Sequence, residues 1–417
     1  MNQKATMLSQ KVELLAPAGD LEKLKYAIIY GADAVYIGGE IFGLRASSRN
    51  FTEDQMREGL DFAHSKGKKV FLTLNIIPHN EDLELLEGYI DLLKNLDFDA
   101  FILSDPGTLM FMREKMPSAE LHLSTQANNT NYMSATFWHQ QGIKRVILAR
   151  ELSFDEIAEI RAKTPPTLEL ESFVHGAMCI SYSGRCLISN YMTNRDANKG
   201  SCSHPCRWKY HLVEETRPGE YFPIEEDESG TYFFNSKDLC LIEHMPEMIR
   251  SGLDSLKIEG RSKSVYYVAN IVRVYREAID RFYADPEGFV YNPEWMEEIE
   301  KASHREFTTG FFHDKPSEDA QLYTNESYVR EFTFVGVVKE YDADRGLALV
   351  EQRNRMFVGD AIEVVGPSYF RFDQTIDEMY NHQGEAIDVA PHAQQMVWIK
   401  MQQPVAPYHI LRKRKEI

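Results

Sequence analysis

The stretch that decides the fold is VELLAPAGDLEKLKYAIIYGADAVYIGG, residues 12–39. Its two ends, VELLAP and DAVYIGG, are short and nearly continuously apolar, as buried parallel strands are. Between them, Asp20 and Gly31 are the start and stop signals of an amphipathic helix. The stretch therefore predicts a strand–helix–strand unit whose two strands run parallel.

The same alternation continues to about residue 280. Six further runs have the length and apolar character of strands: KVFLTLN from Lys69, AFILSD from Ala100, ELHLSTQA from Glu120, RVILARE from Arg145, LELESFVHG from Leu168 and DSLKIEG from Asp254. Helical segments separate them, and Ser153 with Glu156 predicts a capping box at the start of one. Eight strictly alternating units favour a closed (β/α)8 TIM-like barrel over an open sheet.

A chain of 417 residues is long enough for two domains. We expect the barrel, as the catalytic domain, over residues 1–283, and a helical linker punctuated by prolines over residues 284–330. From Phe332 the pattern changes to strand-like runs separated by glycine and aspartate turns. We therefore expect a small C-terminal β-barrel over residues 331–417, with docking or the guiding of RNA as its natural role.

All five cysteines fall in one window, and four of them follow the spacing C-x6-C-x15-C-x3-C. The window lies in a long loop after the seventh predicted strand. We expect this cysteine-rich insertion, residues 176–237, to hang over the strand ends where the active sites of such barrels sit. Clustered thiols favour a soft metal, and the spacing favours an iron–sulfur cluster, with zinc or no metal left open. Cys240 is interpreted as a packing residue just inside a helix that starts near Asp238, with a ligand role as the alternative.

Composition narrows the class of protein. No segment has the roughly 20 apolar residues of a membrane span, and the first eleven residues are too polar for a secretion signal. We expect a soluble, cytoplasmic protein without membrane contact. A net charge of −18 repels nucleic acid on average. Any RNA must therefore meet a local basic patch, either beside the cysteines or in the tail 412–415, which is otherwise a frayed, solubilising terminus.

The stretch ESFVHGAMCISYSGRCLIS, residues 171–189, resembles the signature of the collagenase-like peptidases of unassigned catalytic type, the peptidase U family. The resemblance covers nearly the whole chain, including HLSTQANNTN (122–131), NSKDLCLIEHMPEMI (235–249), SLKIEGRSKSVYYVA (255–269) and REFTTGFF (305–312). Within that family the chain is most similar to the branch that hydroxylates transfer RNA. The resemblance implies a prephenate-dependent, iron–sulfur-containing enzyme that forms 5-hydroxyuridine at the wobble position.

The same resemblance implies a ligand set and partners. Cys179, Cys186, Cys202 and Cys206 match the four ligands of a 4Fe–4S cluster in the tRNA-modifying branch. The implied partners are the anticodon loop of tRNA, prephenate as co-substrate, and the iron–sulfur assembly machinery. Sister groups hydroxylate a ribosomal RNA cytidine, and the family label keeps a collagenase-like peptidase as an alternative. No G-x-S-x-G or H-E-x-x-H motif supports a peptidase.

Polar residues at the predicted strand ends are the active-site candidates. They are Asn75, Asp105, Ser124, Gln126, Arg150, Glu151, His175, Glu259 and Arg261. Because arginine grips carboxylates through paired hydrogen bonds, we expect Arg45, Arg150 and Arg261 to hold the dicarboxylate donor. Alternatively, Arg150 with Glu151 and Glu259 with Arg261 are ion pairs that brace the rim.

Three further interpretations remain open at this point. His175 is included as a catalytic candidate, and with Cys179 it forms a Cys/His pair that a nucleophilic mechanism would need. Lys257, inside the eighth strand, needs a partner if it faces inward and otherwise extends to the surface. The aromatic residues of the cysteine loop, Tyr182, Tyr191 and Trp208, either stack on a splayed RNA base or pack the loop onto the barrel.

Overall fold

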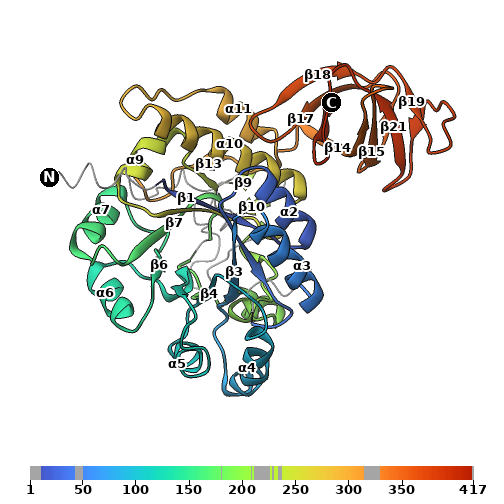
Figure 1. The fold of residues 1–417 in the computed structure, drawn as a ribbon. Helices are drawn as coiled ribbons and strands as arrows, with labels where there is room; N and C mark the ends of the chain where they lie inside the picture. The colour runs from blue at the N-terminus through green and yellow to red at the C-terminus, as the bar shows by residue number, and fades with distance from the viewer. Residues whose placement is uncertain are drawn as a thin grey trace.

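A closed barrel of eight parallel strands forms the larger part of the molecule (Figure 1). The structure is a computed structural model that describes residues 11–42, 50–179, 181–207, 209–210, 226–227, 230–232, 237–313 and 329–415. The barrel strands are β1 (Glu13–Pro17), β2 (Ala34–Gly38), β3 (Lys69–Leu74), β4 (Ala100–Leu103), β5 (Leu121–Leu123), β6 (Arg145–Ile147), β7 (Glu169–Ala177) and β12 (Ser255–Ile258). They pair in chain order, and β12 closes the ring by pairing with both β7 and β1. The predicted TIM-like barrel is confirmed.

Helices surround these strands on the outside of the barrel (Figure 1). They are α2 (Leu21–Ile29), α3 (Glu53–His64), α4 (Asn80–Leu93), α5 (Pro106–Lys115), α6 (Tyr132–Gln140), α7 (Phe154–Lys163), α9 (Met245–Arg250) and α10 (Val265–Ala284). The start signals in the sequence act as expected. The Asp20 carboxylate accepts a hydrogen bond from the backbone N–H of Lys23 at 2.9 Å, and Ser153 with Glu156 forms the predicted capping box.

The chain departs from the simple alternation between β7 and β12. Strand β11 (Asp238–Cys240) runs antiparallel to the end of β7, and β13 (Phe307–Thr308) pairs beyond it. The prediction that a helix starts near Asp238 is therefore wrong, and the next α-helix, α9, begins at Met245. The reason is that nine-residue β7 extends past its barrel neighbours, and its free edge takes β11 as a partner. Asp238 is buried there in an ion pair with Arg305, at 2.6 Å.

The C-terminal part is an antiparallel half-barrel sheet of seven strands in the order β18-β17-β22-β14-β15-β21-β19. Its strands are β14 (Phe332–Asp342), β15 (Leu347–Gln352), β17 (Ala361–Val365), β18 (Arg371–Thr375), β19 (Met379–Tyr380), β21 (Met396–Lys400) and β22 (Ile410–Arg414). A second hydrophobic core, separate from that of the barrel, lies on this sheet. The exact domain limits at residues 283 and 330 stay predictions.

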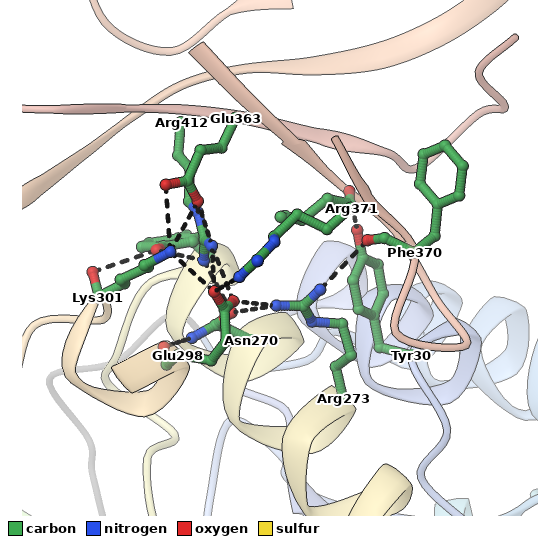
Figure 2. A network of polar contacts seen from close by, with 11 residues as sticks. Tyr30, Asn270, Arg273, Glu298, Lys301, Glu363, Phe370, Arg371 and Arg412 are labelled. Atoms are coloured by element: carbon green, nitrogen blue, oxygen red, sulfur yellow. Dashed lines mark hydrogen bonds and ion pairs between the residues drawn. The ribbon is translucent and has the colours of Figure 1, made fainter. Parts of the chain in front are cut away.

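A buried polar network holds the half-barrel sheet against α10 and against α11 (Glu294–Glu300), and Figure 2 shows it. Arg412 on β22 is fully buried, with Nη2 at 2.8 Å from Glu298 Oε2 and 2.5 Å from Glu363 Oε2. Glu298 also pairs with Lys301 and Arg371, at 2.8 and 2.9 Å, and with Arg273. We call these residues, together with Asn270, the Glu298 cluster. The interpretation of the tail as a frayed terminus is therefore wrong, because Arg412 sits in the interface and the next residue, Lys413, pairs with Asp360 at 2.7 Å.

Contacts from α2 add to the same interface. The hydroxyl of Tyr30 donates to the backbone carbonyl of Tyr408 at 2.8 Å, and Arg353 forms an ion pair with Glu22. The sheet thus touches α2, α10 and α11, and its position beside the barrel is fixed from three helices (Figure 1). Among the described helices, none is both long enough and apolar enough to cross a membrane.

Candidate active site at the barrel mouth

A cavity of about 80 Å³ lies at the carboxyl ends of the barrel strands. We call it the mouth cavity. It is lined by Tyr36, Thr73, Asn75, Ile102, Ser124, Thr125, Gln126, Ile147, Arg150, Phe173, Lys257, Glu259 and Arg261. Six of these were polar candidates in the sequence, so the rule that barrel strands end at the active site brings the right residues together. The volume is well below the roughly 300 Å³ of ordinary ligand pockets, which suits one end of a small molecule.

Arg150 enters the cavity from the loop after β6. Its Nη1 donates to the carbonyl of Ala177 at 2.8 Å, its Nη2 donates to the Ser183 hydroxyl at 2.9 Å, and its guanidinium lies 5.1 Å from the centre of the Phe173 ring. No described carboxylate pairs with it, so the alternative of an Arg150–Glu151 ion pair is wrong. Burial raises the pKa of Glu151, and the nearby Arg150 does not fully offset that rise. Arg150 thus brings a positive charge to the mouth that neutral groups orient.

Arg261 enters from the loop after β12 and is almost completely buried. Its Nη1 donates to the Thr73 hydroxyl at 3.3 Å, and its Nη2 donates to the side-chain oxygen of Asn50 at 3.0 Å. The guanidinium packs directly on the backbone of Gly38, where an added Cβ would lie 2.0 Å from Nη2. The glycine at the end of β2 is therefore what allows an arginine to occupy this side of the cavity.

Lys257 faces into the barrel, which resolves the choice that the sequence left open. Its Nζ lies 2.9 Å from Glu171 Oε1 and 4.5 Å from the centre of the Tyr36 ring. Burial lowers the pKa of the Lys257 ammonium group, and the attraction of Glu171 offsets this only in part. Burial by itself raises the pKa of Glu171, but Lys257 and Arg145 outweigh it, so that the carboxylate is held in its charged form. This ion pair forms the charged floor of the mouth cavity.

Two amide oxygens at the cavity have no hydrogen-bond partner among the described residues. Asn75 donates from its Nδ2 to the Ser124 hydroxyl at 3.0 Å, yet its Oδ1 is buried and unsatisfied, and so is Gln126 Oε1. A buried polar atom without a partner costs about 1–3 kcal/mol. Such atoms in a cavity lined by cations indicate a place for a polar ligand that carries both acceptors and donors.

The cysteine segment, residues 178–207 as far as they are described, is seated on the loops around the mouth. It contains α8 (Ile188–Thr193) and the 3₁₀ turns η2 (Ala197–Lys199) and η3 (Pro205–Arg207). The backbone N–H of Ile77 donates to Asn198 at 3.1 Å, after β3, and Asn128 donates to the carbonyl of Ser183 at 2.9 Å, after β5. Lys199 pairs with Asp82 at 2.9 Å. These contacts place the segment against the same barrel face as the mouth cavity.

The four thiols of this segment are chemically suited to a metal cluster. Cys179 is exposed, Cys186, Cys202 and Cys206 are partly buried, and none forms a disulfide. Within the part of the chain that the structure describes, no three His, Cys, Asp or Glu side chains lie close enough together to bind one metal ion. The donor set therefore fits a cluster by type and number, while the thiols stand apart. Ligand sets often converge only when the metal binds, because binding and folding of such loops are coupled.

The structure does not bring His175 to the cavity. A one-residue bulge between β7 and β12 resets the alternation after Phe173, so the His175 ring faces α10 and packs 5.5 Å from the Tyr275 ring. Burial lowers the pKa of His175 to about 3, so the imidazole is neutral. None of its ring contacts is with Cys179. Arg45, the remaining predicted donor ligand, lies outside the described residues, as does Trp208.

Other candidates are placed as follows. Cys240 lies opposite His175 in β11, and burial raises the pKa of its thiol to about 12, which fits its interpretation as a packing residue. Asp105 caps α5 by accepting from the N–H of Thr108 at 2.8 Å and does not line the cavity. Tyr182 and Tyr191 are exposed on the cysteine segment, Tyr191 at 88%.

Sequence reasoning did not single out Tyr36, Thr73 and Phe173, which line the cavity from inside β2, β3 and β7. Each sits within a nearly continuous apolar run, where a hydroxyl or ring is not conspicuous. The period of two along each strand was the available signal, because it separates residues that face the barrel interior from those that face the helices.

Comparison with known proteins covers almost the whole chain. Residues 19–322 match Peptidase family U32, and residues 330–412 match the Peptidase family U32 C-terminal domain. The chain is 43% identical over 409 residues to tRNA hydroxylation protein P1 of Bacillus subtilis, covering 98% of this chain and 96% of that protein. It is 39% identical over 446 residues to tRNA hydroxylation protein P of Escherichia coli, covering 97% of each. It is also 40% identical over 275 residues to the 23S rRNA 5-hydroxycytidine C2501 synthase of Escherichia coli, covering 66% of this chain and 40% of that protein.

Proposed function

The chain belongs to peptidase family U32, and from that premise we propose that it is a tRNA hydroxylase that forms 5-hydroxyuridine at the wobble position. The proposal is supported by relatives named as tRNA hydroxylation proteins, which match this chain over nearly its full length. The relative that acts on ribosomal RNA matches only 66% of the chain. That difference favours tRNA as the substrate, in the cytoplasm, over a ribosomal RNA cytidine.

The observation that carries the proposal is the concentration of cations and unsatisfied amide oxygens in the mouth cavity. Arg150, Arg261 and Lys257 line it, and Glu259 is the one carboxylate among the lining residues. We propose that Arg150 and Arg261, with Arg45, bind the carboxylates of the hydroxyl donor, prephenate. Since arginine and carboxylate match in geometry, two such contacts would fix the donor's orientation as well as its position.

The remaining lining residues would complete the donor site. The oxygens of Asn75 and Gln126 can accept hydrogen bonds from a hydroxyl group, which would satisfy two buried atoms that lack partners in the described part of the chain. The rings of Tyr36 and Phe173 would exclude water, so that each charge contact is stronger than it would be in solvent.

Cys179, Cys186, Cys202 and Cys206 would hold a 4Fe–4S cluster delivered by the iron–sulfur assembly machinery. When bound, such a cluster supplies an iron that can polarise an oxygen ligand or pass electrons. The position of the cysteine segment against the mouth supports a site next to the donor.

The test is mass spectrometry of nucleosides from cells that lack the gene and carry plasmid-borne variants. We expect 5-hydroxyuridine to disappear from tRNA, to return with the wild-type chain, and to fall at least tenfold with Arg150→Ala, because one bound charge pair contributes a few kcal/mol. Arg57→Ala is the matched control, since Arg57 is exposed on α3 and pairs only locally with Glu53.

Three outcomes would point elsewhere. Unchanged 5-hydroxyuridine in a strain without any paralogue would remove tRNA as the substrate. Loss of a hydroxycytidine from ribosomal RNA would select the alternative RNA. Peptide cleavage by the purified chain that persists in the Arg150→Ala variant would favour the peptidase activity that the family's name implies.

A further inference from the structure

A second and larger cavity, of about 690 Å³, lies between the barrel and the half-barrel sheet. We call it the barrel–sheet groove. Three separate parts of the chain line it: the cysteine segment through His204, the loop after β12 through Glu259 and Lys263, and the C-terminal sheet through residues 330–334 and Lys415. Its volume lies within the roughly 300–1,000 Å³ of functional ligand sites.

The charge of the groove is opposite to that of the whole chain. Lys263, Arg330 and Lys415 line it together with His204, and Glu259 is the one carboxylate among its lining residues. The chain as a whole carries a net charge of −18. A cationic groove in so acidic a molecule marks a place where a polyanion can bind, because elsewhere the field repels it. The groove also contains the N-terminal end of α10, whose helix dipole favours an anion.

Aromatic rings stand beside these cations. Phe332 and Phe334, two residues apart at the start of β14, are half-buried and line the groove. The Phe334 ring is stacked on that of Tyr266, with centroids 5.9 Å apart and planes 16° from parallel. Cations next to partly exposed aromatic rings are the combination that single-stranded nucleic acids require, since phosphates meet the cations and bases stack on the rings.

We propose that the barrel–sheet groove binds a single-stranded segment of the substrate RNA, with phosphates on Lys263, Arg330 and Lys415 and a base against Phe334. This inference rests on the proposed function and adds the surface that holds the RNA. Glu259 lines both the groove and the mouth cavity, so the two are adjacent. RNA held in the groove therefore presents a neighbouring nucleotide at the mouth, which connects the C-terminal sheet to catalysis.

The Glu298 cluster explains why the groove has fixed walls. One wall is built on β14 and the other on α10, and the cluster joins Arg412, on the strand paired to β14, to Asn270 of α10 at 3.1 Å (Figure 2). Arg412 also donates to the hydroxyl of Tyr266, at 3.2 Å, and Tyr266 itself lines the groove. A preformed groove binds without the cost of ordering its two sides.

The test is binding of a fluorescently labelled anticodon stem–loop RNA to the full chain, measured by anisotropy over a series of salt concentrations. The variant Arg330→Gln/Lys415→Gln removes two cations from the sheet side of the groove. We expect its Kd to rise about tenfold or more and its salt slope to fall by about two, one for each lost phosphate contact. A separate variant, Phe334→Leu, should weaken binding about fivefold or more with an unchanged salt slope, because it removes a stacking surface.

The control is Lys339→Gln/Arg345→Gln on the same sheet. These side chains are at least 40% exposed, do not line the groove, and take away the same net charge. The proposal predicts near-wild-type binding for this control. If both double variants weaken binding equally, only long-range charge matters and the groove is not the RNA site. Unchanged binding in Arg330→Gln/Lys415→Gln with an intact thermal transition would also overturn the proposal.

These results are separable from the test of the proposed function, because binding is read without turnover. RNA binding that depends on the groove, in a protein whose deletion leaves 5-hydroxyuridine unchanged, would keep the groove and reject the modification. Loss of 5-hydroxyuridine on deletion, with binding indifferent to groove variants, would do the reverse.

Discussion

At the scale of single residues, the informative positions are charges placed where a sequence pattern predicts only apolar packing. Lys257 and Glu171 face each other inside the barrel at 2.9 Å, and Arg145 approaches the same carboxylate at 3.0 Å. Buried ion pairs contribute little net stability, yet removing one partner leaves an uncompensated charge. Keeping such a pair under the mouth cavity is therefore more readily explained by a role in ligand binding than by stability.

We predict that Glu171→Leu lowers the free energy of unfolding by about 3–5 kcal/mol, because it strands the Lys257 ammonium group in the barrel. Combining it with Lys257→Met should restore a large part of that loss. Urea unfolding of the two single variants and the double variant measures the coupling. Lys163→Met serves as the control, since its exposed pair with Glu159 should be worth less than about 1 kcal/mol. Additive effects of the two barrel substitutions would contradict the structure.

The candidate site was predictable where a residue's position in the chain decides its place, and not where a local irregularity does. Asn75, Ser124, Gln126, Arg150, Glu259 and Arg261 line the cavity because each follows or ends a strand. His175 also ends a strand, but the bulge after Phe173 turns its ring toward α10. No property of the local sequence announces that extra residue, because the bulge depends on the register with β12.

At the scale of elements, local signals predicted the eight barrel strands and their helix starts, since capping and apolar periodicity act over a few residues. The two short strands β11 and β13 were not predicted. They form through pairing between segments more than 60 residues apart, with Asp238 opposite both Ala177 and Phe307. Such short strands have little intrinsic preference and take their conformation from the edge they join.

The cysteine segment carries the prediction at this scale. We expect protein purified without oxygen to contain iron and acid-labile sulfide, and expect Cys179→Ser to lose most of both, since a cluster with three thiolates is labile. Cys240→Ser is the matched control: that thiol is buried away from solvent, and its loss should cost some stability and leave the iron content unchanged. Equal iron content in all three proteins, measured by colorimetric assay, would reject the ligand set.

At the scale of the whole molecule, the sequence predicted a second, strand-rich part but not its place beside the barrel. The contact depends on residues 114 positions apart, Glu298 and Arg412, whose pairing no local pattern reveals. A basic tail is usually exposed, which is why the terminal interpretation failed. What distinguishes Arg412 is the alternation along β22, which places it on the face that meets α10 and α11.

The interface should respond to acid. Burial by itself raises the pKa of Glu298, but Arg412 and Arg273 outweigh it and hold that pKa well below its usual range. A carboxylate with a depressed pKa in the folded state stabilises fully above its unfolded value, about 4.3, and this stabilisation is lost as pH falls further. We expect the free energy of unfolding to drop below about pH 4.5, and expect Glu298→Gln to be less stable at neutral pH with a flatter acid limb.

Urea unfolding at neutral and acidic pH checks this. Glu297→Gln is the control, because Glu297 is exposed on the same helix. An acid limb of equal steepness in Glu298→Gln and wild type would show that the cluster does not set the pH response. Weaker RNA binding by Glu298→Gln, at a pH where its barrel is still folded, is the further expectation that connects this cluster to the groove.

The order of synthesis gives the Glu298 cluster a consequence in the cell. Every barrel element is translated before β22, so the nascent barrel emerges from the ribosome with Glu298 already made and Arg412 still to come. Until that strand is released and docks, the wall formed by β14 has no anchor on α10. We expect a chain stalled short of β22 to be unable to capture RNA, so that unfinished polypeptides do not sequester transfer RNA from translation.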